Sequence, residues 1–143
     1  MTLSIIIVSY NVKSYLRQCL NSIYQSVGID SYDVIVVDNY SHDNSCEMIE
    51  REFPEIKLIK NAKNLGFSKA VNIGFNHAAG DTVCLLNPDT LISEDTFKVL
   101  LDYIVKHHNI GCIGPKIFNP DGSLQLACKR SFPNLFTAFF KLI

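Results

Sequence analysis

Polar residues that could do chemistry stand directly after short apolar runs of the chain. Asp38 and Asn39 close the run Y-D-V-I-V-V, while Asn87 and Asp89 follow the run T-V-C-L-L. A carboxylate at the end of a strand can accept hydrogen bonds from a base or a ribose. A hard oxygen ligand at such a place can also hold Mg²⁺ or Mn²⁺ against a diphosphate. The same residue types form turns and caps without any ligand, so position alone leaves both interpretations open.

A second candidate is the segment Asn64-Leu65-Gly66-Phe67, which opens a predicted helix. The free amides and the dipole of a helix start can face an anion, and Gly66 permits a close backbone approach or a positive φ. Lys69 could reach a phosphate, although an exposed helix lysine is the more common explanation. We interpret the rings of Phe67 and Phe75 as core rather than as platforms for a base.

Several cofactor and catalytic motifs are missing from the sequence. There is no G-x-G-x-x-G after the first apolar run, no G-x-x-x-x-G-K-[ST] and no G-x-S-x-G. These absences argue against a dinucleotide-binding Rossmann site, a P-loop and a hydrolase nucleophile elbow. The 4 histidines are scattered over a turn and helix ends, where we expect exposed side chains. The 5 cysteines are widely spaced without a C-x-x-C, so we expect reduced, mostly buried thiols.

Strands and helices are predicted to alternate along the chain. We expect strands over 3–10, 32–37, 56–59, 82–86 and 110–118, with a turn at 119–122 (N-P-D-G) and an extended segment at 123–128. We expect helices over 46–53 and 66–79, one between its N-cap Asn11 and Gly28, one from its N-cap Ser93 to Lys106, and a helical segment from 134 onward. Gly80 is the candidate C-cap of the third helix. The alternation predicts an α/β fold, a three-layer α/β/α arrangement with a mainly parallel sheet, which binds ligands outside the carboxyl ends of its strands.

The composition limits the classes of function. The 143 residues are 48% hydrophobic and 19% charged, which indicates a chain with a real core rather than a disordered one. The 13 basic and 14 acidic residues give a net charge of −1, which disfavours nucleic acid as a partner. No apolar run reaches about 18 residues, so we expect no transmembrane helix, and the first residues lack the basic region of a signal peptide.

Five stretches taken together resemble the inverting glycosyltransferases of family two, and among them the bacterial rhamnosyltransferase-type enzymes of surface-polysaccharide assembly. The stretches are S-I-I-I-V-S-Y-N (4–11), V-V-D-N-Y-S-H-D-N-S (36–45), N-L-G-F-S-K-A-V-N-I-G (64–74), L-L-N-P-D-T (85–90) and D-G-S-L-Q-L-A-C-K-R-S-F-P (121–133). The resemblance implies the glycosyltransferase A-type fold, a UDP- or dTDP-linked sugar donor, and transfer with inversion to a glycan or lipid-linked acceptor.

The resemblance also implies roles for the matching residues. Ser9 and Tyr10 would line the nucleoside pocket, and Asp38 would bind the base or the ribose. Asn87 and Asp89 stand where the family carries its D-x-D metal motif, so Asp89 would remain as the ligand of Mg²⁺ or Mn²⁺. The residues assigned in this way to the nucleotide-sugar site are Ser9, Tyr10, Asn11, Asp38, Asn39, Asn64, Gly66, Phe67, Lys69, Asn72 and Asn87.

Two departures from the family pattern shape the expectation. Asn87 replaces the first carboxylate of the metal motif, which puts strict metal dependence in doubt. Enzymes of this family are considerably longer, and the Asp or Glu that deprotonates the acceptor hydroxyl follows the donor half, so we expect the general base beyond Ile143. We therefore expect residues 1–143 to form a single donor-binding domain that is truncated before the base and the acceptor half, with Lys129 and Arg130 near an anionic donor or a lipid-linked acceptor.

Two other functions stay open at this point. A non-catalytic nucleotide-binding or oligomerisation module derived from the same fold would fit Asn87 and the missing base. A sugar-nucleotide pyrophosphorylase would need a Gly-rich, Arg-containing loop after the first strand, and residues 10–13 are not that loop.

We expect a cytoplasmic location that extends to the inner face of the cell membrane. The apolar end over 135–143 favours a homodimer or contact with a membrane surface.

Overall fold

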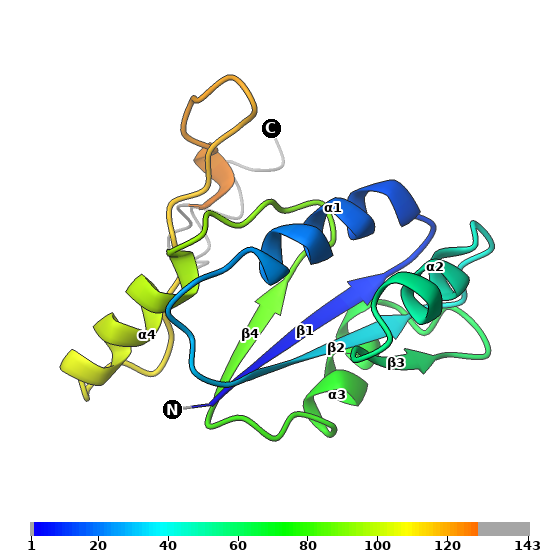
Figure 1. The fold of residues 1–143 in the computed structure, drawn as a ribbon, viewed down its shortest axis with the longest axis horizontal. Helices are drawn as coiled ribbons and strands as arrows, with labels where there is room; N and C mark the ends of the chain where they lie inside the picture. The colour runs from blue at the N-terminus through cyan, green and yellow to red at the C-terminus, as the bar shows by residue number, and fades with distance from the viewer. Residues whose placement is uncertain (1, 129–143) are drawn as a thin grey trace, which may run out of the picture. The chain divides into compact units, whose positions relative to one another are not determined.

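The computed structural model describes residues 2–128, and the chain divides into two compact units, residues 1–108 and 109–143. Figure 1 shows the first unit as a sheet with helices on both sides. Its elements in chain order are β1 (Leu3–Ser9), α1 (Lys13–Tyr24), β2 (Tyr32–Asp38), α2 (Ser45–Glu52), β3 (Lys57–Lys60), α3 (Phe67–Phe75), β4 (Thr82–Leu86) and α4 (Thr96–Lys106).

The sheet has four parallel strands in the order β3-β2-β1-β4. The helices α1 and α2, together with Phe97 of α4, pack on one face, and α3 packs on the other. From β1 the chain adds β2 and β3 on one side of the sheet and then β4 on the other side. The strand order therefore reverses between β1 and β4, and this is the topological switch point where open α/β sheets bind ligands. The predicted α/β/α arrangement with a parallel sheet is confirmed.

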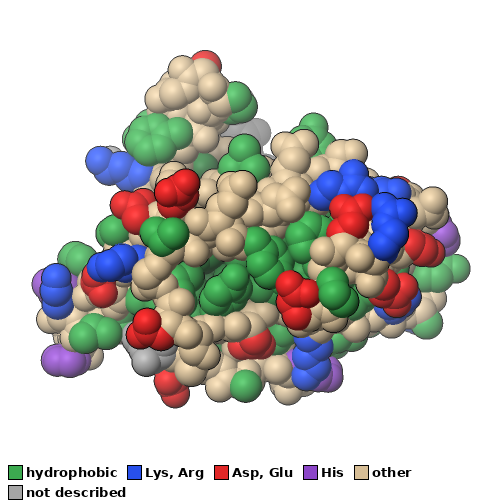
Figure 2. All heavy atoms as spheres, viewed as in Figure 1, with side chains coloured by type: hydrophobic (Ala, Val, Ile, Leu, Met, Phe, Trp, Pro, Cys, Tyr) green, Lys and Arg blue, Asp and Glu red, His purple; other side chains and the backbone are tan. Residues whose placement is uncertain are grey.

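The central strands form because both of their faces are covered. Ile5 and Ile7 of β1 pack with Leu16 and Leu20 of α1, whereas Ile6 points to the opposite face and packs in the cluster beneath α3. This alternation is why β1 reads as a continuous apolar run. Figure 2 shows hydrophobic side chains gathered around α1, with charged side chains mainly toward the margins of the unit.

Buried hydrogen bonds close the amino end of the sheet. The Ser4 hydroxyl donates to Asp33 Oδ1 at 2.6 Å and accepts from the amides of Ala79 at 3.2 Å and Gly80 at 2.9 Å. Gly80 was expected to cap α3, but α3 ends at Phe75 and Gly80 instead brings the backbone close to β1. A Cβ on Gly80 would lie 2.7 Å from the Ser4 nitrogen, so the glycine is required by close approach.

Two predicted N-caps are wrong. Asn11 has a φ of 53° and lies one residue before the actual N-cap of α1, Val12, whose side chain makes no capping hydrogen bond. The N-cap of α4 is Asp95 rather than Ser93, again without a side-chain hydrogen bond. The sequence predicts caps at Asn11 and Ser93 because Asn and Ser favour such positions. Asn11 is instead used in a loop contact described below.

The second unit contains little regular structure within its described residues. The strand predicted over 110–118 does not form, and its last residue, Phe118, makes only an isolated antiparallel bridge to Leu124. The N-P-D-G turn is confirmed, because the Gly122 amide donates to the Asn119 carbonyl at 2.9 Å and Gly122 has a φ of 81°. The segment predicted as extended ends in a short 3₁₀ helix, Leu126–Cys128. Lys129, Arg130 and the helix predicted from 134 lie outside the described residues.

Three further predictions concern the described residues as a whole. No helix within residues 2–128 is long and apolar enough to cross a bilayer. The five cysteines are all unpaired, as expected, but burial is less uniform than predicted: Cys19 is buried, Cys112 is exposed and the other three are half-buried. All four histidines are exposed, as predicted.

Candidate functional site

Two buried polar atoms without partners mark the carboxyl edge of the sheet. Ser9 and Asp38 end β1 and β2, and they are paired neighbours in the sheet register. Ser9 is 0% exposed and Asp38 2% exposed, yet Ser9 Oγ and Asp38 Oδ1 have no hydrogen-bond partner among the described residues. The other carboxylate oxygen, Oδ2, accepts from the Ser41 amide at 2.8 Å. Since buried polar groups are normally paired, these two atoms point to an incoming donor group.

The thiol of Cys46 adds to the electrostatics around Asp38. Burial and the neighbouring Asp38 carboxylate together raise the pKa of Cys46 to about 12. Cys46 is therefore a neutral thiol at physiological pH and adds no negative charge beside Asp38.

Asn11 joins the loop after β1 to the loop after β2. Its backbone amide donates to Ser41 Oγ at 2.9 Å, and its side-chain Oδ1 accepts from the His42 amide at 2.8 Å. The φ of 53° at Asn11 and of 74° at Tyr40 places both residues in the left-handed region. The reciprocal contact fixes the two loops, in which the rings of Tyr10, next to Ser9 in the sequence, and Tyr40, two residues after Asp38, are exposed.

Asn39 lies at the centre of a second contact, between the loops after β2 and β3. Its Nδ2 donates to Asn64 Oδ1 at 2.8 Å, and its Oδ1 accepts from Asn61 Nδ2 at 3.2 Å and from the Leu65 amide at 2.9 Å. The segment then continues to Gly66, the N-cap of α3, with a φ of 80° and open space around its Cα. Gly66 is therefore favoured by its backbone conformation and not by a steric contact.

The start of α3 presents its side chains to solvent. Phe67 is 60% exposed and Phe75 is 56% exposed, so the prediction that both rings belong to the core is wrong. In this nine-residue helix the covered stripe is carried by Ala70 and Gly74 instead. Lys69 and Asn72 are exposed on the same helix.

The Asn-Pro-Asp turn after β4 is held by a hydrogen bond within the turn and by a second one from α1. The Thr90 amide donates to the Asn87 carbonyl at 3.2 Å, which closes the turn. The Cys19 thiol donates to the same carbonyl at 3.7 Å. Burial raises the pKa of Cys19 to about 12, with a further contribution from the negative charge of Asp89, so the thiol keeps its proton. Asn87 and Asp89 themselves are exposed.

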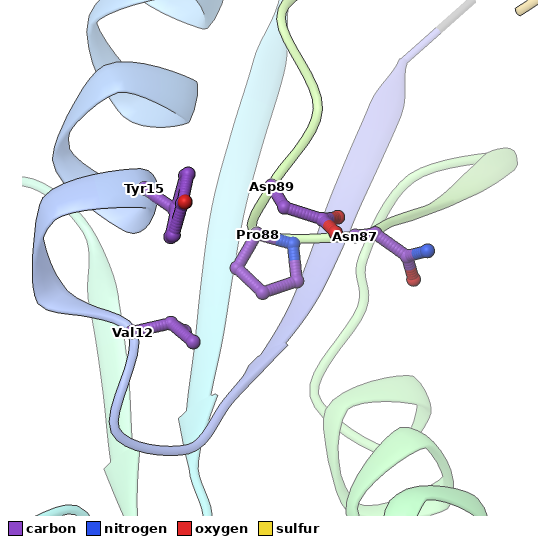
Figure 3. A pocket seen from close by; sticks show the side chains of 5 residues that line it. All are labelled: Val12, Tyr15, Asn87, Pro88 and Asp89. Atoms are coloured by element: carbon purple, nitrogen blue, oxygen red, sulfur yellow. The ribbon is translucent and has the colours of Figure 1, made fainter. Parts of the chain in front are cut away.

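A hollow of about 510 Å³ lies between this turn and the start of α1, beside the switch point. Figure 3 shows the ring of Pro88 facing Val12 and Tyr15, and the side chain of Asn87 pointing away from α1. The lining residues are Val12, Tyr15, Asn87, Pro88 and Asp89. The hollow therefore joins apolar and aromatic surface to one exposed carboxylate.

The sequence of this chain matches Glycosyl transferase family 2 over residues 4–140. The chain belongs to this family. It is 33% identical over 124 residues to the minor teichoic acid biosynthesis protein GgaB of Bacillus subtilis, a match that covers 83% of this chain and 14% of GgaB. It is 28% identical over 145 residues to an N-acetylglucosaminyl-diphospho-decaprenol L-rhamnosyltransferase of Mycobacterium tuberculosis, covering 93% of this chain and 46% of that protein.

Solved structures give the same fold. Residues 1–349 of Staphylococcus aureus TarS, in complex with UDP-GlcNAc, superpose with a TM-score of 0.70 at 25% identity, over 82% of this chain and 38% of that chain. The mannosyltransferase PcManGT of Pyrobaculum calidifontis shares the fold with a TM-score of 0.70 at 23% identity, over 83% of this chain and 36% of its own. The chain spans less than half the length of the curated relatives named above.

The carboxyl edge of the sheet is built from more residues than the sequence singled out. Val12, Tyr15 and Pro88 line the hollow, and Ser41 and Asn61 hold the loops, but none of them was assigned a role. Tyr15 lies on the first turn of the helix after β1, four residues before the buried Cys19, which places it near the carboxyl edge of the sheet. This place on the first turn of the helix is the sequence feature that could have identified Tyr15 as a residue of the hollow. The contacts of Ser41 and Asn61 depend on loop pairing and leave no periodic pattern in the sequence.

Proposed function

We propose that this chain is the donor-binding part of a glycosyltransferase. It takes a sugar from a UDP- or dTDP-linked nucleoside diphosphate and transfers it, with inversion, to a glycan or lipid-linked acceptor in bacterial surface-polysaccharide biosynthesis. The observation that carries the proposal is the pair of buried, unpartnered atoms Ser9 Oγ and Asp38 Oδ1 at the carboxyl edge. The membership in family two and the names of the relatives support the same reaction class.

In this proposal the nucleoside lies at the ends of β1 and β2. The free oxygen of Asp38 accepts a hydrogen bond from a base N–H or a ribose hydroxyl, which offsets the cost of its burial. The exposed first turn of α3, with Lys69, lies on the nucleotide side of the site. Its unpaired amides and the helix dipole favour the negatively charged diphosphate.

The residues after β4 fit a divalent cation. Asp89 offers an exposed carboxylate and Asn87 an amide, which are the hard oxygen ligands that Mg²⁺ and Mn²⁺ prefer. The described residues contain no group of three or more His, Cys, Asp or Glu that could hold a metal by themselves. Asp89 would therefore hold the ion together with diphosphate oxygens and water. When bound, the ion neutralises the charge that grows on the diphosphate leaving group.

The proposal also states what the donor site leaves to other groups. Asp38 and Asp89 are both committed to the donor, so neither serves as the general base that deprotonates the acceptor hydroxyl. We propose that residues 1–143 act as one donor-binding domain of an enzyme that works in the cytoplasm, at the inner face of the membrane where a lipid-linked acceptor would be found.

A thermal-shift experiment tests the donor site. The chain is heated with UDP, dTDP, GDP or ADP, each with and without Mn²⁺, because a ligand that binds only the folded state raises its stability. We expect stabilisation by UDP or dTDP that depends on Mn²⁺ and is lost in Asp89→Ala. The chain offers a matched control: Asp121 ends a second Asn-Pro-Asp turn, where its carboxylate bonds to Ser123. Asp121→Ala should keep the metal-dependent shift.

Two outcomes would change the proposal. A chain that no nucleotide stabilises does not carry the donor site. A longer version of the protein that binds UDP or dTDP but turns over no nucleotide sugar would favour the non-catalytic module, for which Asn87 in the metal motif is the supporting observation.

A further inference from the structure

The carboxamide of Asn39 makes three hydrogen bonds, and all of them go to the segment that follows β3. Its partners are Asn64 Oδ1 at 2.8 Å, Asn61 Nδ2 at 3.2 Å and the Leu65 amide at 2.9 Å. The backbone amide of Asn39 is also used, because it donates to the Ser9 carbonyl at 2.8 Å. Asn39 therefore ties the end of β1, the end of β2 and the loop before α3 to one another.

This amide has little capacity left for a ligand. A carboxamide oxygen can accept two hydrogen bonds, and both are supplied here by Asn61 and Leu65. One of the two N–H groups is taken by Asn64, and the side chain is only 3% exposed. A bound nucleotide would have to displace contacts within the protein to reach it. The neighbouring Asp38 differs, because one of its oxygens is buried without a partner.

We propose that Asn39 is a positioning residue: it fixes residues 61–66, and with them the start of α3, against the strand end that carries Asp38, and so sets donor affinity without touching the donor. The inference rests on the proposed function, since it assumes that the donor contacts Asp38 and the start of α3. It replaces the direct role in donor binding that the sequence predicted for Asn39.

The physical reason is the cost of ordering a loop. Without the three side-chain bonds, the loop keeps one backbone bond to the end of β2, from the Asn61 amide to the Asp38 carbonyl at 2.9 Å. Residues 62–64 and Gly66 are exposed, and Asn61 and Leu65 are only half-buried, so packing contributes little to holding this segment. A loop that is loose in the free protein must be ordered when the donor binds, and the free energy of that ordering is lost from affinity.

Asn39→Asp breaks one contact at nearly constant shape, and because it also adds a negative charge beside Asp38, the uncharged variant Asn61→Ala is needed to assign a loss of UDP affinity to the loop. The aspartate keeps the shape of asparagine and can still accept from Asn61 Nδ2 and the Leu65 amide. It cannot donate to Asn64 Oδ1, and two acceptor oxygens would then face each other. Rotation of the Asn64 amide would relieve this only by removing the oxygen that accepts from the Gly66 amide at 2.9 Å. The substitution therefore breaks the contact whichever way Asn64 responds.

Ser4→Ala is the matched control. Ser4 is fully buried and also makes three side-chain hydrogen bonds, but at the opposite end of the sheet. Loss of these bonds should lower thermal stability, and it should leave the loop before α3 and nucleotide affinity unchanged. Asn61→Ala is a milder second variant, which removes one bond to Asn39 and keeps the backbone bond to Asp38.

Two measurements on the chain decide the inference, both made well below the melting temperature of every variant. Hydrogen exchange follows the Leu65 amide, and calorimetry gives the Kd of UDP in the presence of Mn²⁺. We expect Asn39→Asp to accelerate exchange at Leu65 and to weaken UDP binding about tenfold, which corresponds to about 1.4 kcal/mol. Asn61→Ala should change both in the same direction by less, and Ser4→Ala should change neither.

The inference is overturned if Leu65 exchanges at the same rate in Asn39→Asp and Ser4→Ala. It is equally overturned if exchange accelerates and UDP affinity stays the same, because the loop would then be held for stability alone. A wild-type chain that binds no nucleotide would remove the proposed function, and the exchange rates would still decide whether Asn39 holds the loop.

Discussion

Asp38 gives the sharpest prediction at the scale of a single residue. In Asp38→Asn the side chain keeps its shape and can still accept from the Ser41 amide, but an NH₂ group replaces the unpartnered oxygen. We expect nucleotide affinity to fall about tenfold or more, because a donor group of the ligand would now meet another donor. Stability should stay equal or rise, since a buried charge is removed. Calorimetry with UDP and thermal melting check the two effects, and unchanged affinity would contradict the assignment of Asp38.

The candidate site could be predicted from sequence only in part. The sequence predicts that Asp38 and Asp89 lie at one edge, because each follows a buried strand and the ends of parallel strands meet there; the structure places both at this edge, and their contact with a donor stays a prediction. The roles of Asn11 and Asn39 were not visible in this way. The sequence assigns both to donor binding, yet the side chain of each forms hydrogen bonds with a distant loop. Asn11 contacts His42, 31 residues away, and Asn39 contacts Asn64, 25 residues away. Such a contact depends on how two loops meet, which no local pattern records.

At the scale of elements, the fit of α3 against the sheet depends on Gly74. A Cβ at this position would lie 2.5 Å from Ile6 Cγ2 and 3.3 Å from Val37 Cγ2, so helix or strand must shift to admit it. We expect Gly74→Ala to lower the free energy of unfolding by about 1–3 kcal/mol, although alanine is the better helix former by about 1 kcal/mol. Denaturant unfolding measures this difference.

Ser68→Ala, on the exposed side of the same helix, is the control for helix propensity and should stay within about 0.5 kcal/mol of the wild type. If Gly74→Ala were as stable as the wild type, close packing of α3 on β1 would not contribute as described.

The strands show why some elements could be predicted and others could not. β1, β2 and β4 lie within one residue of their predicted bounds, because runs covered on both faces carry a strong signal. The run over 110–118 is also apolar, but it contains Gly114-Pro115 and pairs with no strand within residues 2–128 apart from the bridge at Phe118. A β-strand requires a neighbouring strand to pair with, and the sequence of the run itself does not show whether such a neighbour exists. The exposed Phe67 shows the same limit for α3, since the sequence did not reveal which stripe of this short helix meets the sheet.

At the scale of the first unit, the two layers of helices give the site its position. α1 and α2 cover one face and α3 the other, so the chain crosses the sheet between β3 and β4. The loops after β1 and β4 consequently separate at the switch point, where the hollow lies. Cys19 connects this arrangement to stability, because it is buried in the core between α1 and the sheet and also supports the turn after β4.

The buried thiols predict how stability depends on pH. The pKa of Cys19 is raised from 9.0 to about 12 in the folded chain, chiefly by burial. Between these values the unfolded chain loses the thiol proton and the folded chain keeps it, so the stabilisation is complete below pH 9 and falls as the pH rises. At one unit above the unfolded pKa the loss from this thiol is about 1.4 kcal/mol. Denaturant unfolding from about pH 8 to about pH 10 measures the slope.

Two cysteine variants isolate this contribution. Cys19→Ala should be less stable than the wild type near pH 8 because it leaves a cavity, but its stability should fall less steeply toward pH 10. Cys46, whose pKa is raised to about 12 chiefly by burial, contributes equally to both proteins and cancels in the comparison. Cys112→Ala should keep the wild-type slope, since this thiol is exposed. Equal slopes for Cys19→Ala and the wild type would mean that Cys19 is not protected from water between α1 and the sheet, and its support of the Asn-Pro-Asp turn would then be in error as well.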